Sequence, residues 1–92
     1  MIRSFRDSET ERLFNDMFSK RFQVVEKTAR RKLYQIHQAR SLKDLSALPG
    51  NRLEALSGDR DGQYSIRIND QFRVCFRWST GDAFEVEIAD YH

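Results

Sequence analysis

The chain of 92 residues carries 16 Lys or Arg, 14 Asp or Glu and a single cysteine, Cys75, and its formal net charge is +2. One cysteine excludes a disulfide framework and a thiolate metal cluster, and it favours a reducing compartment. The opening residues lack the apolar core of a signal peptide, and no stretch approaches the ~18 apolar residues that a membrane helix needs. We therefore expect one domain over residues 1–92, located in the cytoplasm and away from membranes.

The charge is distributed unevenly along the chain. Residues 1–50 carry eleven Lys or Arg against six Asp or Glu, whereas residues 51–92 carry five against eight. Every Lys or Arg in the second half is an arginine, a side chain that binds phosphate or carboxylate through two parallel hydrogen bonds. The five arginines are Arg52, Arg60, Arg67, Arg73 and Arg77. They can form a recognition surface on a sheet, or they can pair with glutamates on neighbouring strands.

Two amphipathic helices are predicted in the first half. The first covers residues 8–18, begins with Ser8 and Glu11 at capping-box spacing, and has an apolar face that extends to Met17 and Phe18. The second is ~17 residues long and has an apolar stripe at helical spacing, formed by Phe22, Val25, Ala29, Leu33 and Ile36. A further turn over residues 41–48 ends at Pro49-Gly50.

Three basic residues fall on the far side of the second helical pattern: Lys20, Lys27 and Arg31. A solvated helix face accounts for them, and so does a contact with an anionic partner such as the ribosome or an acidic protein. Either contact would be sensitive to salt.

From residue 64 onward the apolar period changes from 3.6 to 2. Segments 64–68, 72–78 and 84–88 each have one apolar face, and turn residues separate them at 69–71 and 79–82. This pattern predicts an antiparallel meander, with residues 52–56 and 2–5 as further edge segments. The fold class is therefore α+β, with the two N-terminal helices packed on the apolar face of an antiparallel sheet.

The apolar pattern also fixes which residues face one another. If the apolar positions share one face, Arg67 lies opposite Arg73 and Arg77 lies opposite Glu85. Like charges opposite one another destabilise a sheet. We therefore interpret Arg67 and Arg73 as cations without a structural partner, placed for an anionic ligand, and expect that removing one of them relieves repulsion.

The strand over 84–88 leads directly into Asp90, Tyr91 and His92. A carboxylate, a phenol and an imidazole beside arginines suit RNA cleavage by the 2′-hydroxyl, which needs a base, an acid and cations for the phosphoryl oxygens. The imidazole of His92 titrates near neutral pH in its unperturbed state. A frayed polar tail is the alternative reading of the triplet. The sequence offers no cluster of metal ligands and no cofactor motif.

Three parts of the sequence together carry a family resemblance: residues 49–76, residues 86–92 and the opening Met1-Ile2-Arg3-Ser4-Phe5. In these parts the chain resembles the HigB branch of the RelE/ParE toxin superfamily. The resemblance implies helices against an antiparallel sheet, ribosome-dependent cleavage of mRNA without a metal or cofactor, and neutralisation by a HigA-like helix-turn-helix antitoxin. Contact with operator DNA is then indirect, through the antitoxin.

The resemblance also assigns roles to residues. Asp90, Tyr91 and His92 match the family's catalytic triplet, Arg73 matches its sheet arginine, and Arg60 matches its loop arginine; Arg67 is the further substrate-binding candidate. Glu54 and Ser57 stand where some relatives have a histidine and a lysine, a departure that is compatible with slower cleavage, with milder toxicity or with another target. Two alternatives remain: a ParE-like inhibitor that acts by binding without catalysis, and a protein that mainly modulates the antitoxin's grip on DNA.

Overall fold

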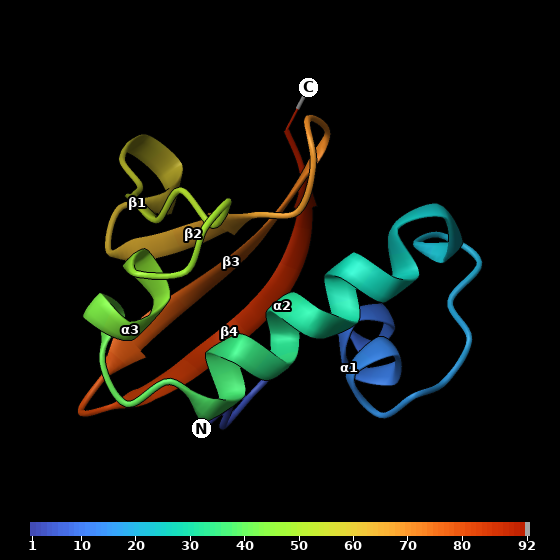
Figure 1. The fold of residues 1–92 in the computed structure, drawn as a ribbon, viewed down its shortest axis with the longest axis horizontal. Coiled ribbons are helices and arrows are strands. Elements are labelled where there is room, and N and C mark those ends of the chain that lie inside the picture. Colours follow the sequence, from blue (N-terminus) through green and yellow to red (C-terminus); the bar gives the residue numbers. More distant parts are fainter. Residues whose placement is uncertain (92) are drawn as a thin grey trace.

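A computed structural model describes residues 1–91. Figure 1 shows the α-helices in the first half of the chain and the strands, with one short helical turn, in the second half. The sheet has the order β1-β2-β3-β4 with antiparallel neighbours, so the predicted α+β class and antiparallel meander are confirmed. The elements are α1 (Ser8–Phe14), η1 (Gln23–Val25), α2 (Glu26–Gln38), α3 (Leu42–Ser46), β1 (Glu54–Ala55), η2 (Gly58–Arg60), β2 (Gln63–Arg67), β3 (Phe72–Ser79) and β4 (Asp82–Asp90).

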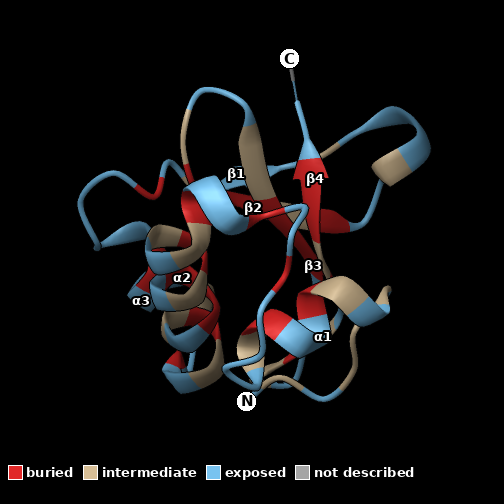
Figure 2. Ribbon diagram, turned by 90° about the vertical axis from the view of Figure 1, so that its right-hand side faces the viewer, coloured by how far each residue is buried: buried red, intermediate tan, exposed pale blue. Residues whose placement is uncertain are grey.

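The apolar stripe predicted for the second helix forms the centre of the core. All five of its residues are buried, although the first turn is a 3-10 turn, η1, and the α-helix begins at Glu26. They share one cluster with the apolar faces of β2, β3 and β4, which includes Ile66, Val74, Phe76 and Val86. Figure 2 shows this arrangement as buried segments on the strands and exposed outer turns on the helices.

The first helix differs from the prediction at both ends. Its N-cap is Asp7, whose Oδ1 accepts a hydrogen bond of 2.6 Å from the Thr10 backbone N–H, so the capping box expected at Ser8 and Glu11 is wrong. The helix ends at Phe14, because Asp16 adopts a left-handed φ of 63° that a continuing helix excludes. Met17 and Phe18 consequently leave the apolar face and are 50% and 60% exposed.

The short helix α3 forms as the leucine spacing predicts. Ser41 is its N-cap and makes a reciprocal capping box with Asp44, which satisfies backbone N–H groups that the first turn would leave without partners. Leu45 is fully buried under this turn.

Residues 2–6 run parallel to β4, which confirms the edge segment predicted over residues 2–5. Ile2 and Phe5 form bridges with Ala83 and Val86, and the Ser4 hydroxyl accepts a hydrogen bond of 2.9 Å from the Glu85 backbone N–H. The chain start therefore covers the outer edge of β4, and an uncovered strand edge would be open to pairing with another chain.

The predicted register of β3 and β4 is wrong beyond Cys75. There the pairing shifts by one residue, so Arg77 faces Phe84 instead of Glu85. Glu85 adopts a φ of 52°, as in a β-bulge, where one strand places two residues against one of its neighbour. The predicted ion pair nevertheless forms, with 2.6 Å between Arg77 Nε and Glu85 Oε2.

The N-cap assignment can be tested by two alanine substitutions. We expect Asp7→Ala to lower the free energy of unfolding by about 1 kcal/mol, because the Thr10 N–H loses its acceptor. Ser8→Ala should change it by less than about 0.5 kcal/mol, the range for exposed positions. Urea denaturation measures both values, and equal losses would show that Ser8 contributes to the cap.

Candidate active site

The end of β4 is fastened to the loop that joins β2 and β3. The Tyr91 backbone N–H donates to the Gln71 carbonyl at 2.6 Å, and Gln71 Nε2 donates to Asp90 Oδ2 at 3.1 Å. The loop is itself shaped by Asn69, whose Oδ1 accepts from the backbone N–H groups of Gln71 and Phe72. Two of the three predicted catalytic residues at the chain end, Asp90 and Tyr91, are thereby held beside the β2–β3 turn; His92 lies outside the described residues.

Arg67 and Arg73 face each other across β2 and β3, as predicted. They line a surface hollow of about 340 Å³ next to Tyr91. Their neighbours around the hollow include a third arginine, Arg52, and one glutamate, Glu54; the full lining is Arg52, Glu54, Arg67, Asn69, Asp70, Arg73 and Tyr91. The register therefore places positive charge beside the predicted catalytic end of β4.

The prediction that Arg73 lacks a structural partner is wrong. Its Nε donates to Ser65 Oγ at 2.7 Å, and its Nη2 donates to the Arg52 carbonyl at 2.6 Å. The Glu54 carboxylate adds an ion pair at 4.0 Å, and the Arg73 side chain is 11% exposed. A guanidinium fixed at two of its nitrogens binds the sheet together and is also pre-oriented toward the hollow.

Arg67 also has a partner, contrary to the prediction. Its guanidinium pairs with Asp70, whose side chain is fully exposed in the β2–β3 loop. A neighbour so exposed to water contributes little stability and is readily exchanged for another anion. Each of the two opposed arginines therefore has its own partners, in β1, β2 and the preceding loop for Arg73 and in the β2–β3 loop for Arg67. The apolar pattern does not reveal these partners.

A buried amide behind the hollow was missed in the sequence. Asn51 is fully buried and accepts a hydrogen bond from Lys32 on α2, while its Nδ2 donates to Gln35 Oε1 and to the Leu45 carbonyl. The Asn51 carbonyl accepts from the Arg67 backbone N–H at 2.7 Å. Hydrophobic periodicity cannot identify a buried polar residue in a connecting loop, so Asn51 was not predicted. The adjacent Pro49-Gly50 indicates only that a defined turn forms there.

The Tyr91 hydroxyl lies above the sheet, 3.8 Å from Cys75 Sγ. Burial raises the pKa of Tyr91, and the hydrogen bond with Cys75 raises it further, while Arg60 and Arg73 oppose the change. Burial likewise raises the pKa of the Cys75 thiol. Both groups are therefore protonated at neutral pH, and Tyr91, which is 40% exposed, can donate a hydrogen bond from the edge of the hollow.

The predicted substrate ligand Arg60 is the last residue of η2 and pairs with β4. Its Nη1 is 2.7 Å from Glu87 Oε1 and donates to Gln63 Oε1 at 3.1 Å. It does not line the arginine hollow. Its charge reaches Tyr91, whose pKa it lowers.

A model of the family described as "RelE-like toxin of type II toxin-antitoxin system HigB" matches residues 3–92. The chain belongs to this HigB-like toxin family. It is 37% identical over 87 residues to Toxin HigB-1 of Vibrio cholerae, an alignment that covers 90% of each chain. It is 39% identical over 41 residues to Endoribonuclease HigB of Proteus vulgaris, covering 45% of each chain.

A solved structure supports the fold of this HigB-like toxin. The chain is similar to one in the YoeB-YefM complex from Staphylococcus aureus, with a TM-score of 0.56 and 21% identity. The likeness covers 100% of this chain and 98% of the other. At this identity it concerns the fold alone.

The three predicted partner-binding cations do not form one stripe. Lys27 and Arg31 lie one turn apart on α2, whereas Lys20 lies before η1 in the connection from α1; all three are exposed. Among residues 1–91, no group of His, Cys, Asp and Glu side chains gathers closely enough to hold a metal ion. Over the same residues, no helix has the length and apolar character needed to cross a bilayer.

The stability of Arg73→Ala shows which effect is larger, the hydrogen bonds that Arg73 donates or its repulsion by Arg67. We expect it to lower the free energy of unfolding by about 2 kcal/mol, because the buried Ser65 hydroxyl and the Arg52 carbonyl lose a charged donor. Arg77→Ala, the matched control at an exposed ion pair, should cost about 0–1 kcal/mol. Thermal and urea unfolding report both values. A rise in the melting temperature of Arg73→Ala would mean that repulsion from Arg67 outweighs these bonds.

Proposed function

We propose that this toxin is an endoribonuclease that cleaves mRNA on the translating ribosome, in the cytoplasm. The observation that carries the proposal is the hollow beside Tyr91, lined by three arginines, at the end of the strand that delivers Asp90. Its lining suits a phosphodiester, because guanidinium groups match phosphate oxygens in charge and geometry. The name of the Proteus vulgaris relative, an endoribonuclease, agrees with this activity.

The proposed reaction is attack by the RNA's own 2′-hydroxyl on the adjacent phosphorus. The 2′-oxygen forms a bond to phosphorus and gives its proton to a base, while the bond to the 5′-oxygen breaks and that oxygen receives a proton from an acid. A 2′,3′-cyclic phosphate and a 5′-hydroxyl end result. The protein supplies no nucleophile, metal or cofactor in this scheme; it supplies proton transfer and charge.

The described residues divide these tasks. Arg52, Arg67 and Arg73 stabilise the negative charge that grows on the phosphoryl oxygens in the transition state. Tyr91, kept protonated by its raised pKa, donates a hydrogen bond to the phosphate or stacks on a base. Asp90, together with His92, carries the proton transfer.

Two further residues modify the site. Glu54 lies at the hollow, 4.0 Å from Arg73 Nη2, and its carboxylate lowers the positive potential that an RNA phosphate meets. Because of this negative charge, we expect slower cleavage than in relatives that have a histidine at this position. Arg60, outside the hollow, contacts the RNA.

Primer extension on a reporter mRNA tests the function. With purified ribosomes and toxin, new 5′ ends should appear inside the coding sequence when the message is translated and be absent when initiation is blocked. Intact mRNA in both conditions would favour an inhibitor that acts by binding alone.

The proton-transfer groups can be tested separately. Asp90→Ala and His92→Ala should each lower the cleavage rate by about 10²-fold or more, the contribution typical of a general acid or base. Asp90→Asn controls for the hydrogen bond from Gln71, since it keeps an oxygen acceptor while removing the charge. Circular dichroism and antitoxin binding should stay unchanged. Full activity in either alanine variant would exclude that residue from proton transfer.

The proposed partners are the ribosome, mRNA and a HigA-like helix-turn-helix antitoxin through which any contact with operator DNA is indirect. Belonging to a toxin-antitoxin family supports the antitoxin. Lys27 and Arg31 on the exposed side of α2 contact ribosomal RNA in this proposal, since phosphate contacts by lysine and arginine supply most non-specific affinity for nucleic acid.

Charge reversal tests the ribosome contact. We expect Lys27→Glu with Arg31→Glu to weaken co-sedimentation with ribosomes at low salt, and to reduce the dependence of binding on salt, because two phosphate contacts are lost. The thermal stability should stay close to that of the wild type, as both residues are exposed. Unchanged co-sedimentation would identify the two residues as part of a solvated face.

A further inference from the structure

The connection between α1 and α2, residues 15–25, exposes more apolar surface than a free loop should. Met17, Phe18 and Val24 are 50%, 60% and 94% exposed. Loops that meet only water are usually polar, so three large exposed apolar side chains in so short a connection stand out. This segment, which we call the connector, therefore has the composition of an interface.

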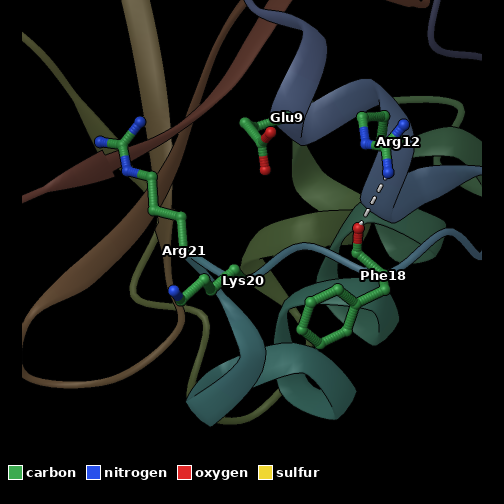
Figure 3. A pocket seen from close by; sticks show the side chains of 5 residues that line it. All are labelled: Glu9, Arg12, Phe18, Lys20 and Arg21. Carbon is green, nitrogen blue, oxygen red and sulfur yellow. Dashed lines mark hydrogen bonds between the residues drawn. The ribbon is translucent and has the colours of Figure 1, made fainter.

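The connector borders a hollow of about 630 Å³. Figure 3 shows Phe18, Lys20 and Arg21 of the connector around it, together with Glu9 and Arg12 of α1. Three cations and one exposed aromatic side chain thus line the same hollow. The single carboxylate, Glu9, accepts a hydrogen bond of 2.6 Å from the buried Ser19 hydroxyl.

The connector is held in one shape by its own hydrogen bonds. Arg12 Nη2 donates to the Phe18 carbonyl at 3.3 Å, and the Met17 backbone N–H donates to the Arg12 carbonyl at 2.9 Å. On the other side, Arg21 lies over the ring of the buried Phe22, 5.0 Å from its centroid. A preformed surface loses less conformational entropy on binding than a flexible one.

The chemistry of this surface selects its occupant. Nucleic acid would use the cations and could stack a base on Phe18, but it gains little from Met17 and Val24. A second copy of the chain would bring the same cations together across a two-fold axis. An acidic protein segment with a large apolar side chain satisfies both the cations and the apolar groups.

We propose that the connector and its hollow form the docking site for an acidic segment of the antitoxin, with an apolar side chain of that segment packed on Phe18. The proposal rests on the proposed function in one respect, that the partner is the antitoxin of the same pair. This site shares no lining residue with the arginine hollow beside Tyr91. The antitoxin then inhibits without filling the catalytic hollow, by keeping the toxin from the ribosome.

Isothermal titration calorimetry tests the site directly. The probe is the purified product of the reading frame adjacent to the toxin gene, titrated into the full-length toxin at low and high salt. Phe18→Ser should weaken binding about 30-fold or more, the effect of removing a central apolar anchor. Lys20→Glu should weaken it chiefly at low salt.

Two substitutions on α3 and the turn after it provide matched controls. Lys43→Glu reverses an exposed charge, and Leu48→Ser truncates an apolar side chain that is 38% exposed. Both should leave the affinity unchanged. All four variants should keep the melting temperature of the wild type to within a few degrees, because each replaces an exposed side chain.

The opposite results overturn the docking site. Unchanged affinity in Phe18→Ser and Lys20→Glu does so, as does a wild-type toxin that does not bind the probe. Lost ribosome co-sedimentation with unchanged antitoxin affinity would assign the surface to ribosomal RNA. Calorimetry does not depend on cleavage, so a wild type that binds the antitoxin through Phe18 but leaves mRNA intact would refute the nuclease and keep the docking site.

Discussion

The buried side chain of Asn51 is the contact on which the geometry of the arginine hollow depends. Lys32 donates to its oxygen, and its nitrogen donates to Gln35 and to the carbonyl of Leu45, so one amide joins α2 to the end of α3. Burial lowers the pKa of Lys32, and the charges of Arg31 and Arg67 lower it further. A buried polar group without partners would cost about 1–3 kcal/mol, so these bonds constrain one another to a single arrangement.

The buried Asn51 side chain fixes the position of the backbone carbonyls that bind Arg67 and Arg73. The Asn51 carbonyl receives the Arg67 backbone N–H, and the next carbonyl, that of Arg52, receives the Arg73 guanidinium. Arg52 has a φ of 47°, in the left-handed region that a side chain with a Cβ seldom occupies. The strained residue turns its carbonyl toward Arg73 while its own side chain lines the hollow. Structural roles and the proposed functional roles therefore coincide in the same few residues.

The two proposed surfaces divide the work of the toxin between different parts of the fold. The proposed catalytic hollow is built at the facing ends of β2 and β3 and in the adjoining loops, where hydrogen bonds across the sheet fix the register. The proposed docking surface is built from a short connection whose shape depends on hydrogen bonds with Arg12 of α1. Because the two hollows have no lining residue in common, a substitution in one leaves the lining of the other intact. Inhibition and catalysis can then change independently through substitution.

The hydrophobic pattern in the sequence determined the core and most of the pairing. A period of 3.6 marked the stripe of α2, and a period of 2 marked three strands whose shared apolar face placed Arg67 opposite Arg73. These features are local, because burial of one face dictates where each side chain points. The acid and base groups of the terminal Asp-Tyr-His could also be recognised in the sequence. The resemblance to HigB toxins could be recognised from its motifs.

Tertiary structure decided what satisfies each polar group. The partners of Arg73 come from Arg52, Glu54 and Ser65, and the bulge at Glu85 forms where residues near the chain start bond to β4. Such contacts join residues far apart in the chain and leave no periodic trace. The early end of α1 was likewise not visible in the pattern: Met17 and Phe18 continue a helical spacing in sequence, but the backbone turns at Asp16 and leaves both side chains exposed. Periodicity records which side chains a fold buries, whereas the pairing of polar groups depends on the three-dimensional path that brings them together.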